Sequence, residues 1–476
     1  MLELMESARW RRLTRLQIRL TKMTLLLSDV LAFSLAGLLA AVLIYARAEI
    51  SDEQWLVSQD LQRYWAWLGV VAMGLSSFLI RFGHYSDRKP FWTELGEVLW
   101  VVLVLALLDL AVVGVTRWNS SRMWWLLVWS LAALCVPLMR GVFREAMRRV
   151  RVWQRPALIV GNGPNAKDAM RALHSEPALG FEVSGFVDVA TVLGEKSKAL
   201  HEWTKIPGVQ FVLALEPGQS HLHDSVLRKL SQWHVEDVSV IPAMRGVPLF
   251  GTEITYFFSH EVAWLRLRNN LRYWPARLLK RVVDVFVASV LVVLLALPFA
   301  FIVWLIRRDG GPAIFAHKRV GQSGRLFPCY KFRTMRVDAE EQLRLLLARD
   351  PALLAEWERE FKLRNDPRIT RIGRFLRRTS LDELPQLINV IRGDMSLVGP
   401  RPVIKAELER YGADVDYFLM VRPGITGLWQ VSGRSDSGYE QRVYLDTWYV
   451  KNWSLWYDIA ILFKTIKVVF EGKGAY

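Results

Sequence analysis

Two adjacent carboxylates stand among arginines in the last quarter of the 476-residue chain. They are Asp382 and Glu383 of the segment TSLDELPQL, and the bases around them are Arg374, Arg377, Arg378 and Arg392. One carboxylate can attack a phosphorus atom or hold a metal ion, while guanidinium groups bind phosphate oxygens through paired hydrogen bonds. The residue types therefore predict a site that handles phosphate groups.

The local sequence predicts how this pair is presented. Ser380 and Glu383 have the spacing of a capping box, with Ser380 as N-cap and Glu383 as the third helical residue. A helix that begins there would offer free amides and its positive dipole end to a phosphate. The same acids could instead only complement the dipole, so a structural role stays open. Because cations surround them, we expect low pKa values for both carboxyl groups.

Further bases are separated by glycine and proline. They occur in YKFRTM (330–335), GPRP (399–402) and RPGITG (422–427). A plain run of charge is usually a solvated face, but glycine and proline shape the backbone and can aim single side chains. We therefore expect these segments to converge on the Asp–Glu pair.

Four apolar segments fill the first third of the chain, near residues 24–45, 64–81, 98–116 and 123–143. Each approaches the roughly 20 residues that cross a bilayer. Lys and Arg cluster before the first segment, after the second and after the fourth, which places everything after residue 144 in the cytoplasm. The net charge of +16 suits anionic lipid and phosphorylated substrates, and the two cysteines provide neither a disulfide framework nor a metal site.

The middle of the chain is predicted to be a Rossmann-like α/β domain. Strand-like runs alternate with helical stretches, which is typical of a parallel sheet; the runs are 157–160, 183–187, 210–215 and 238–241. The turn GNGPNA (161–166) approximates a dinucleotide-binding fingerprint, and Asp188 stands where a ribose-binding acid would. Pro164 falls where an amide would face a phosphate, so we assign no ligand to this domain.

A fifth apolar segment, 282–306, has bases at both ends and Pro298 within it. Flanking bases disfavour a span, because one cluster would have to lie outside. Proline removes a helical hydrogen bond and bends the helix. We therefore predict a re-entrant helix that enters and leaves by the cytoplasmic face, with a plain fifth span as the alternative.

Several motifs in order resemble a known family. The segments KRVVDVFVASVLVVLLALP, CYKFRTM, NDPRITRIGRFLRRTSLDELPQLINVIRGDMSLVGPRP and RPGITGLWQVSGR closely resemble bacterial polyprenyl-phosphate hexose-1-phosphate transferases, the monotopic phosphoglycosyl transferases. The resemblance covers the C-terminal 200 residues, and the whole chain looks like the large members that act on galactose. It departs at Leu297-Pro298, where the family commonly has Ser-Pro.

The resemblance implies three domains. They are a four-helix transmembrane domain (1–145), a cytoplasmic Rossmann-like domain (146–270) and a mixed α/β monotopic catalytic domain (271–476) with the re-entrant helix 282–306.

It also implies a two-step reaction. Asp382 would attack the β-phosphorus of a UDP-hexose and release UMP, and undecaprenyl phosphate would then take the hexose-1-phosphate from the covalent intermediate. Glu383 would hold Mg²⁺. By motif position Lys331, Arg377, Arg401 and Asp446 would bind phosphate or order the site, and Arg422 and Arg434 would face the nucleotide. For Asp446 a structural hydrogen bond to a nearby arginine is an equal alternative.

The implied setting is the cytoplasmic face of the bacterial inner membrane. There a homodimer would start lipopolysaccharide O-antigen, capsule or exopolysaccharide synthesis, with membrane lipid but no nucleic acid as a partner. A glucose transferase of the same family and a non-catalytic scaffold for glycosyltransferases are the alternatives. A membrane-anchored nucleotide-sugar dehydratase fits poorly, since its Tyr and Lys spacing occurs only at Tyr85 and Lys89, in a short loop.

Overall fold

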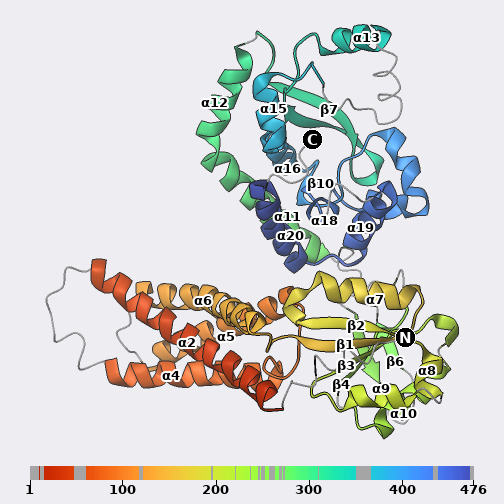
Figure 1. The fold of residues 1–476 in the computed structure, drawn as a ribbon. Coiled ribbons are helices and arrows are strands. Elements are labelled where there is room, and N and C mark those ends of the chain that lie inside the picture. The colour runs from red at the N-terminus through yellow and green to blue at the C-terminus, as the bar shows by residue number, and fades with distance from the viewer. Residues whose placement is uncertain are drawn as a thin grey trace. The chain divides into compact units, whose positions relative to one another are not determined.

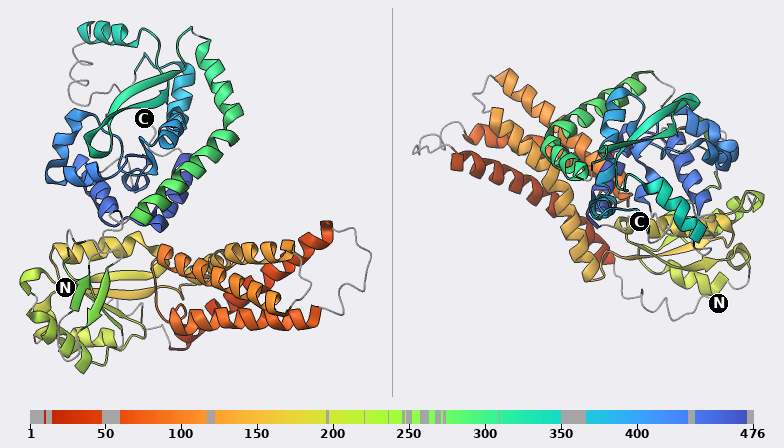
Figure 2. Two further views of the ribbon diagram at one scale, coloured as in Figure 1. Left: turned by 180° about the vertical axis from the view of Figure 1, so that it is seen from behind. Right: turned by 90° about the horizontal axis from the view of Figure 1, so that it is seen from above.

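The computed structural model describes Trp10 and residues 15–47, 60–116, 122–194, 197–219, 221–235, 237–244, 247, 252–256, 263–266, 271, 274–308, 310–349, 366–432 and 438–471. The chain divides into two units, Met1–Arg245 and Gly246–Tyr476. Figures 1 and 2 show the helices and strands of each unit.

All four apolar segments of the first third form helices. They are α2 (Arg15–Arg47), α4 (Asp60–Ser76) continued by the π-helix η1 (Ser77–Arg81), α5 (Phe91–Thr116) and α6 (Arg122–Arg149). Within the described residues, three stretches are long and apolar enough to cross a membrane: Leu16–Ile44, Phe91–Thr116 and Arg122–Arg149. The stretch Trp65–Arg81 is apolar but shorter. Three apolar helices thus indicate membrane association, and the fourth span stays a prediction.

A buried ion cluster joins these helices. Arg140 of α6 donates to both oxygens of Asp29 on α2, at 2.7 and 2.6 Å, and to Glu94 of α5 at 2.6 Å. Asp109 is also buried and accepts a hydrogen bond from the Trp129 indole at 2.9 Å. Charges within such a bundle are stable only when paired, so Arg140 contributes to packing as well as to the charge bias of its segment.

The rest of the first unit is the predicted α/β domain. Its elements are β1 (Arg155–Val160), α7 (Pro164–Ser175), η2 (Pro177–Leu179), β2 (Phe181–Val187), α8 (Val189–Leu193), α9 (Ser197–Thr204), β3 (Gln210–Leu213), η3 (Pro217–Gln219), α10 (Leu222–Gln232) and β4 (Asp237–Val240). The sheet has the order β2-β1-β3-β4 and every pairing is parallel, which confirms the prediction. Figure 1 shows α7 on one face and α9 and α10 on the other.

An internal carboxylate occupies the glycine turn of this domain. Glu216 Oε1 accepts from the Asn165 amide at 2.6 Å, in the first turn of α7. A Cβ on Gly163 would lie 2.4 Å from the same oxygen. Asp188 caps α8 by accepting from the Ala190 amide. The helix end where a dinucleotide phosphate would bind is therefore satisfied by the chain itself.

The second unit contains the Asp–Glu motif. Its elements are β5 (Glu253–Tyr256), β6 (Ala263–Arg266), α11 (Trp274–Leu294), α12 (Ala296–Arg307), β7 (Ile314–Val320), η5 (Gln322–Gly324), β8 (Leu326–Phe332), α13 (Ala339–Arg349), α15 (Arg371–Arg378), η6 (Leu381–Glu383), α16 (Gln386–Arg392), β9 (Ser396–Val398), η7 (Lys405–Asp414), α17 (Val415–Met420), β10 (Gly424–Thr426), α18 (Leu428–Val431), α19 (Tyr439–Lys451) and α20 (Leu455–Glu471). Strands β5 and β6 pair antiparallel, as do β7 and β8, whereas β9 and β10 pair parallel.

The fifth apolar segment is bent, as Figures 1 and 2 show. Helices α11 and α12 meet at Leu295 with an angle of 64°. Pro298 is the third residue of α12, and it has no amide to donate to the carbonyl of Leu294, four residues earlier, where α11 ends. Its missing N–H costs little in a first helical turn. Proline therefore accounts for the break without the serine common in the family, whereas re-entry stays a prediction.

Polar residues of α11 fix it to the rest of the second unit. Lys280 donates to Asp458 of α20 at 2.6 Å and to the Val398 carbonyl of β9 at 3.1 Å. Asp284 accepts from the Ser396 hydroxyl at 2.7 Å and from the Leu397 amide at 3.2 Å. Arg281 donates to the last carbonyls of α16. Lys280 and Arg281, two of the basic residues that flank the fifth apolar segment, thus also bind α16, β9 and α20.

Two glycine motifs touch backbone to backbone. The Gly399 amide donates to Thr426 O at 2.9 Å, and the Gly424 amide donates to Pro400 O at 2.8 Å. A Cβ on Gly399 would lie 2.6 Å from Arg422 O, and one on Gly424 would lie 2.1 Å from Gly399 N. Only glycine permits this approach, which sets the positions of the arginines beside it.

Candidate active site

The two predicted acids lie in η6, a single turn between α15 and α16. Ser380 has a φ of 56°, in the left-handed region, and its side chain caps no amide. The predicted capping box is therefore wrong, because an N-cap residue needs extended backbone angles to reach the third amide. A helix of three residues also offers no extended dipole, so side chains must supply the positive charge.

Lys331 supplies that charge. It is the penultimate residue of β8, and its Nζ lies 2.7 Å from Glu383 Oε1 and 3.8 Å from Asp382 Oδ2. The ammonium group thus holds both carboxylates at one point. Motifs 51 residues apart meet here, as the sequence predicts.

A buried asparagine fixes the strand that carries Lys331. Asn389 of α16 accepts from the Tyr330 amide at 3.0 Å and donates to Pro328 O at 2.8 Å, so its amide group pairs with β8 as a neighbouring strand would. It also donates to Asp394 at 3.1 Å. Sequence reasoning missed this residue. The available signal was a polar residue within the apolar run LINVI.

Burial dominates the titration of Asp382. Desolvation raises the pKa of this carboxyl group above the ordinary aspartate value and outweighs the attraction of Lys331. The neighbouring charge of Glu383 raises the pKa further. The expectation of a low pKa for Asp382 is therefore wrong. Arg374, Arg378 and Arg392 are exposed, whereas Arg377 is partly buried and its charge lowers the pKa of Asp382. A desolvated carboxylate is the more nucleophilic for lacking a hydration shell.

Arg377 reaches the site from the last turn of α15. Its Nε donates to Thr334 Oγ1 at 2.9 Å, just beyond β8, and its charge lowers the pKa of Asp382. Thr370 caps α15 by accepting from the Gly373 amide at 2.9 Å and so fixes where the helix begins. Arg377 thus joins Lys331, Asp382 and Glu383, as predicted by resemblance.

Arg401 and Asp446 belong to a second polar cluster. Asp446 is 2% exposed and accepts from the Tyr411 hydroxyl at 2.9 Å, with Arg442 Nε at 3.8 Å. Burial raises the pKa of Asp446 to about 7, against the attraction of Arg442. The guanidinium groups of Arg401 and Arg442 both lie over the Trp429 ring, at 6.0 and 5.4 Å. The structure therefore gives Asp446 a structural hydrogen bond, but its side-chain donor is Tyr411 and not the arginine side chain that the alternative predicted.

Cys329 lies between the two clusters. Charges of Lys331 and Glu383 on one side and of Arg319 and Arg401 on the other act on its thiol. Burial raises the pKa of Cys329 to about 11, so the thiol stays protonated at neutral pH. Strand β8 therefore connects the clusters, and Asp382 remains the candidate nucleophile.

The other predicted residues lie elsewhere. Arg422 precedes β10. Burial, and after it repulsion from Arg422, lowers the pKa of Arg281. Arg434 lies outside the described residues. Pro298 marks the break between α11 and α12. Sequence reasoning also missed Tyr411 and Arg442, because neither stands in a motif that points to chemistry.

The acid pair fits a magnesium ion shared with a phosphate substrate. Among the described residues, no three His, Cys, Asp or Glu side chains gather as metal ligands. Mg²⁺ is commonly held by one or two carboxylates together with substrate phosphates and water, not by a closed protein cage. Asp382 and Glu383 supply that minimum, so the magnesium expectation is compatible with the donor set.

The raised pKa of Asp382 predicts a stability effect. The folded protein binds this proton more tightly than the unfolded chain, so stability falls as pH rises above the ordinary aspartate pKa of about 3.9. Asp382→Asn removes the buried charge. We expect its melting temperature in detergent at pH 8 to exceed that of the wild type by roughly 2–4 °C, and the gain to shrink as the pH is lowered.

Asp416→Asn is the matched control, since Asp416 is an exposed carboxylate of α17. It should leave the melting temperature unchanged. Equal melting temperatures for Asp382→Asn and the wild type at pH 8 would show that Asp382 is not desolvated.

Comparisons with known proteins agree with this architecture. Residues 275–472 match the family model for bacterial sugar transferases, and residues 82–210 match one described as a CoA-binding domain. The chain is 48% identical to the undecaprenyl-phosphate galactose phosphotransferase of Salmonella typhimurium over 86% of this chain and 87% of that protein. It is 47% identical to the UDP-galactose-lipid carrier transferase of Erwinia amylovora over 96% of this chain and 98% of that one.

A less similar relative is named for a different sugar, glucose. The UDP-glucose:undecaprenyl-phosphate glucose-1-phosphate transferase of Escherichia coli is 38% identical over 42% of each chain. The identities of 48% and 47% to the Salmonella and Erwinia proteins, each over most of both chains, show that this chain belongs to the bacterial sugar transferase family.

Proposed function

We propose that this enzyme transfers hexose-1-phosphate from a UDP-hexose to undecaprenyl phosphate, with galactose as the hexose. The observation that carries the proposal is the convergence of Asp382, Glu383, Lys331 and Arg377 on one partly buried point. The names of the two relatives that match most of the chain support the sugar and the lipid. The match in Escherichia coli keeps glucose as the alternative.

Two displacements at one phosphorus account for the residues. A carboxylate oxygen of Asp382 attacks the β-phosphorus of the UDP-hexose, the bond to the bridging oxygen breaks, and UMP leaves with that electron pair. A phosphate oxygen of the lipid then attacks the same phosphorus and releases the carboxylate, giving undecaprenyl-diphospho-hexose. Division into two steps replaces one difficult displacement by two easier ones. Because burial raises the pKa of Asp382, deprotonation is required before the first step.

The cations would stabilise charge during both steps. Lys331 is placed to neutralise oxygens beside Asp382, and Arg377 approaches the same carboxylate from α15. Glu383, with the substrate diphosphate, would hold Mg²⁺, which supplies further charge neutralisation when bound. Arg401 would contact the nucleotide or its phosphates from beside Trp429. A non-catalytic scaffold would leave the acid pair unexplained.

The setting is proposed to be the inner membrane. The N-terminal helices would span it four times, with both soluble domains on the cytoplasmic side, where nucleotide sugars are made. The bent pair α11–α12 would enter and leave by that side, as the bases at both ends favour. The resemblance supports a homodimer and a role at the start of surface polysaccharide assembly.

Release of UMP tests the reaction and the sugar. With Mg²⁺, purified protein should release UMP from UDP-galactose over many turnovers only when undecaprenyl phosphate is present, since without lipid release stops after one turnover. Release from UDP-glucose should be at least tenfold slower. Asp382→Asn should abolish release, whereas the exposed Asp416→Asn should not. Faster release from UDP-glucose would change the substrate, and no release from any nucleotide sugar by folded protein would favour the scaffold.

Labelling of a cysteine introduced at position 476 tests re-entry. The native Cys135 and Cys329 are both buried, so the new thiol should dominate. A membrane-impermeant maleimide should label it in inside-out vesicles and not in intact spheroplasts. Pro298→Ala restores an amide that can bond to Leu294 O, so it should straighten the pair and lower the membrane-bound yield.

Pro137→Ala is the control, because Pro137 lies inside the apolar helix α6 and away from the break. It should leave the labelling pattern unchanged. Labelling of position 476 from the outer face in the wild type would establish a fifth span instead.

A further inference from the structure

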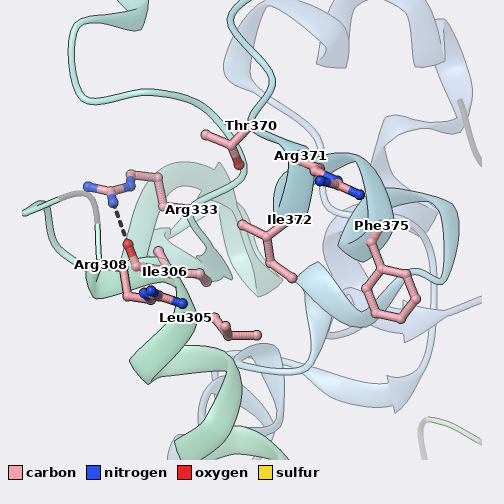
Figure 3. Close-up of a pocket in the computed structure, with 8 residues that line it drawn as sticks. All are labelled: Leu305, Ile306, Arg308, Arg333, Thr370, Arg371, Ile372 and Phe375. Carbon is pink, nitrogen blue, oxygen red and sulfur yellow. Dashed lines mark hydrogen bonds between the residues drawn. The ribbon is translucent and has the colours of Figure 1, made fainter.

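A groove of about 710 Å³ opens in the second unit, away from the acid pair. It lies between the end of α12, the end of β8 and the start of α15 (Figure 3). Its lining residues are Leu305, Ile306, Arg308, Arg333, Thr370, Arg371, Ile372 and Phe375. The volume is that of a site for a small organic ligand.

The lining contributes three guanidinium groups and no carboxylate. Arg333 is held in place by donating to Ile306 O, the carbonyl near the end of α12, at 3.1 Å. Arg308 directly follows α12 and Arg371 begins α15; both are exposed, with Ile372 between them in the view of Figure 3. Neither makes an ion pair with a described acid. Such a set of guanidiniums attracts an anion with several oxygens, such as a phosphate.

The other half of the lining is apolar and continues along α12. Leu305, Ile306, Ile372 and Phe375 form this half, and Phe375 is 46% exposed. From the groove an apolar stripe follows one face of α12 with the spacing of helical turns. It consists of Trp304, Phe301 and Leu297, which are 57%, 58% and 83% exposed. A ligand with a phosphate head and a hydrocarbon tail would match both halves.

The groove is adjacent to the active site without being part of it. Arg333 follows Lys331 by two residues at the end of β8, which is about 7 Å of extended chain. Helix α15 runs from Arg371 at the groove to Arg377 at the site, a rise of about 9 Å. A phosphate bound at the groove therefore lies beside the site, offset from Lys331 and Arg377 along both elements.

We propose that this groove is the docking site of the isoprenoid phosphate acceptor. The inference rests on the proposed function. The phosphate lies among Arg308, Arg333 and Arg371, and the first part of the chain lies on Leu305, Ile372 and the stripe of α12. The acceptor waits there during attack on the nucleotide sugar, then advances along α15 to the reacting phosphorus.

The sugar nucleotide and free phosphate fit less well. A UDP-hexose carries a polar sugar and base, which the apolar half of the groove would desolvate without hydrogen bonds. Inorganic phosphate would use the guanidiniums but not Phe375 or the stripe. The combination of bases and exposed apolar side chains therefore selects a lipid phosphate.

Separate measurement of the two half-reactions tests the assignment. The double variant Arg308→Gln/Arg371→Gln should raise the KM for undecaprenyl phosphate about tenfold. The amount of UMP released without lipid and its rate should be unchanged, because both residues lie away from Asp382. Phe375→Ser should raise the same KM without changing that first step.

The matched control is Arg336→Gln/Arg344→Gln, which removes two exposed charges outside the groove. It should change neither half-reaction. A slower first step in the groove variants would assign the groove to the sugar nucleotide. If only the arginine variant changes the KM, and inorganic phosphate competes with the lipid in the wild type but not in that variant, the groove binds free phosphate. Unchanged KM values with a normal UMP burst would overturn the docking site and leave the proposed reaction intact.

Discussion

The attachment of α11 to the catalytic fold is the constraint on which the site depends. Lys280 and Asp284 stand one helical turn apart and bind α20 and β9 in a buried position, with Asp458 as the counter-charge. Apolar contacts are not directional and do not by themselves fix where a helix lies. These hydrogen bonds do, and they require α11 to lie at one place on the domain. Because α16 packs on both α11 and β8, the position of Lys331 follows from that of the apolar helix α11.

In the candidate active site, desolvation of the Asp382 carboxylate lowers the stability of the fold at neutral pH. Lys331 lies 2.7 Å from Glu383 but 3.8 Å from Asp382, and the effect of burial on the pKa of Asp382 outweighs the attraction of this ammonium group. In the second cluster, Asp446 accepts a hydrogen bond from Tyr411, yet burial raises its pKa as well. Strand β8 connects these two environments through Cys329.

Much of this fold was predictable because its signals are local. Apolar length, strand alternation and Pro298 each act on nearby residues, so the helices, the parallel sheet and the bend were expected and are present. The capping box at Ser380 failed because a left-handed residue overrode its spacing. The prediction of a low pKa for Asp382 was wrong because a count of arginines does not say which of them lie close to the carboxylate. Asn389 was missed since its bonds join residues about 60 positions apart.

The central claim is that Asp382 carries the sugar phosphate between two steps. The most direct measurement is a rapid-mix assay with UDP-galactose, Mg²⁺ and enzyme but no lipid, followed by peptide mass spectrometry. The account predicts a burst of UMP approaching one per active site and a hexose-phosphate adduct on the peptide that contains Asp382. Undecaprenyl phosphate should then remove the adduct. Release of UMP only when lipid is present, with no adduct at any time, would contradict the account and favour direct transfer.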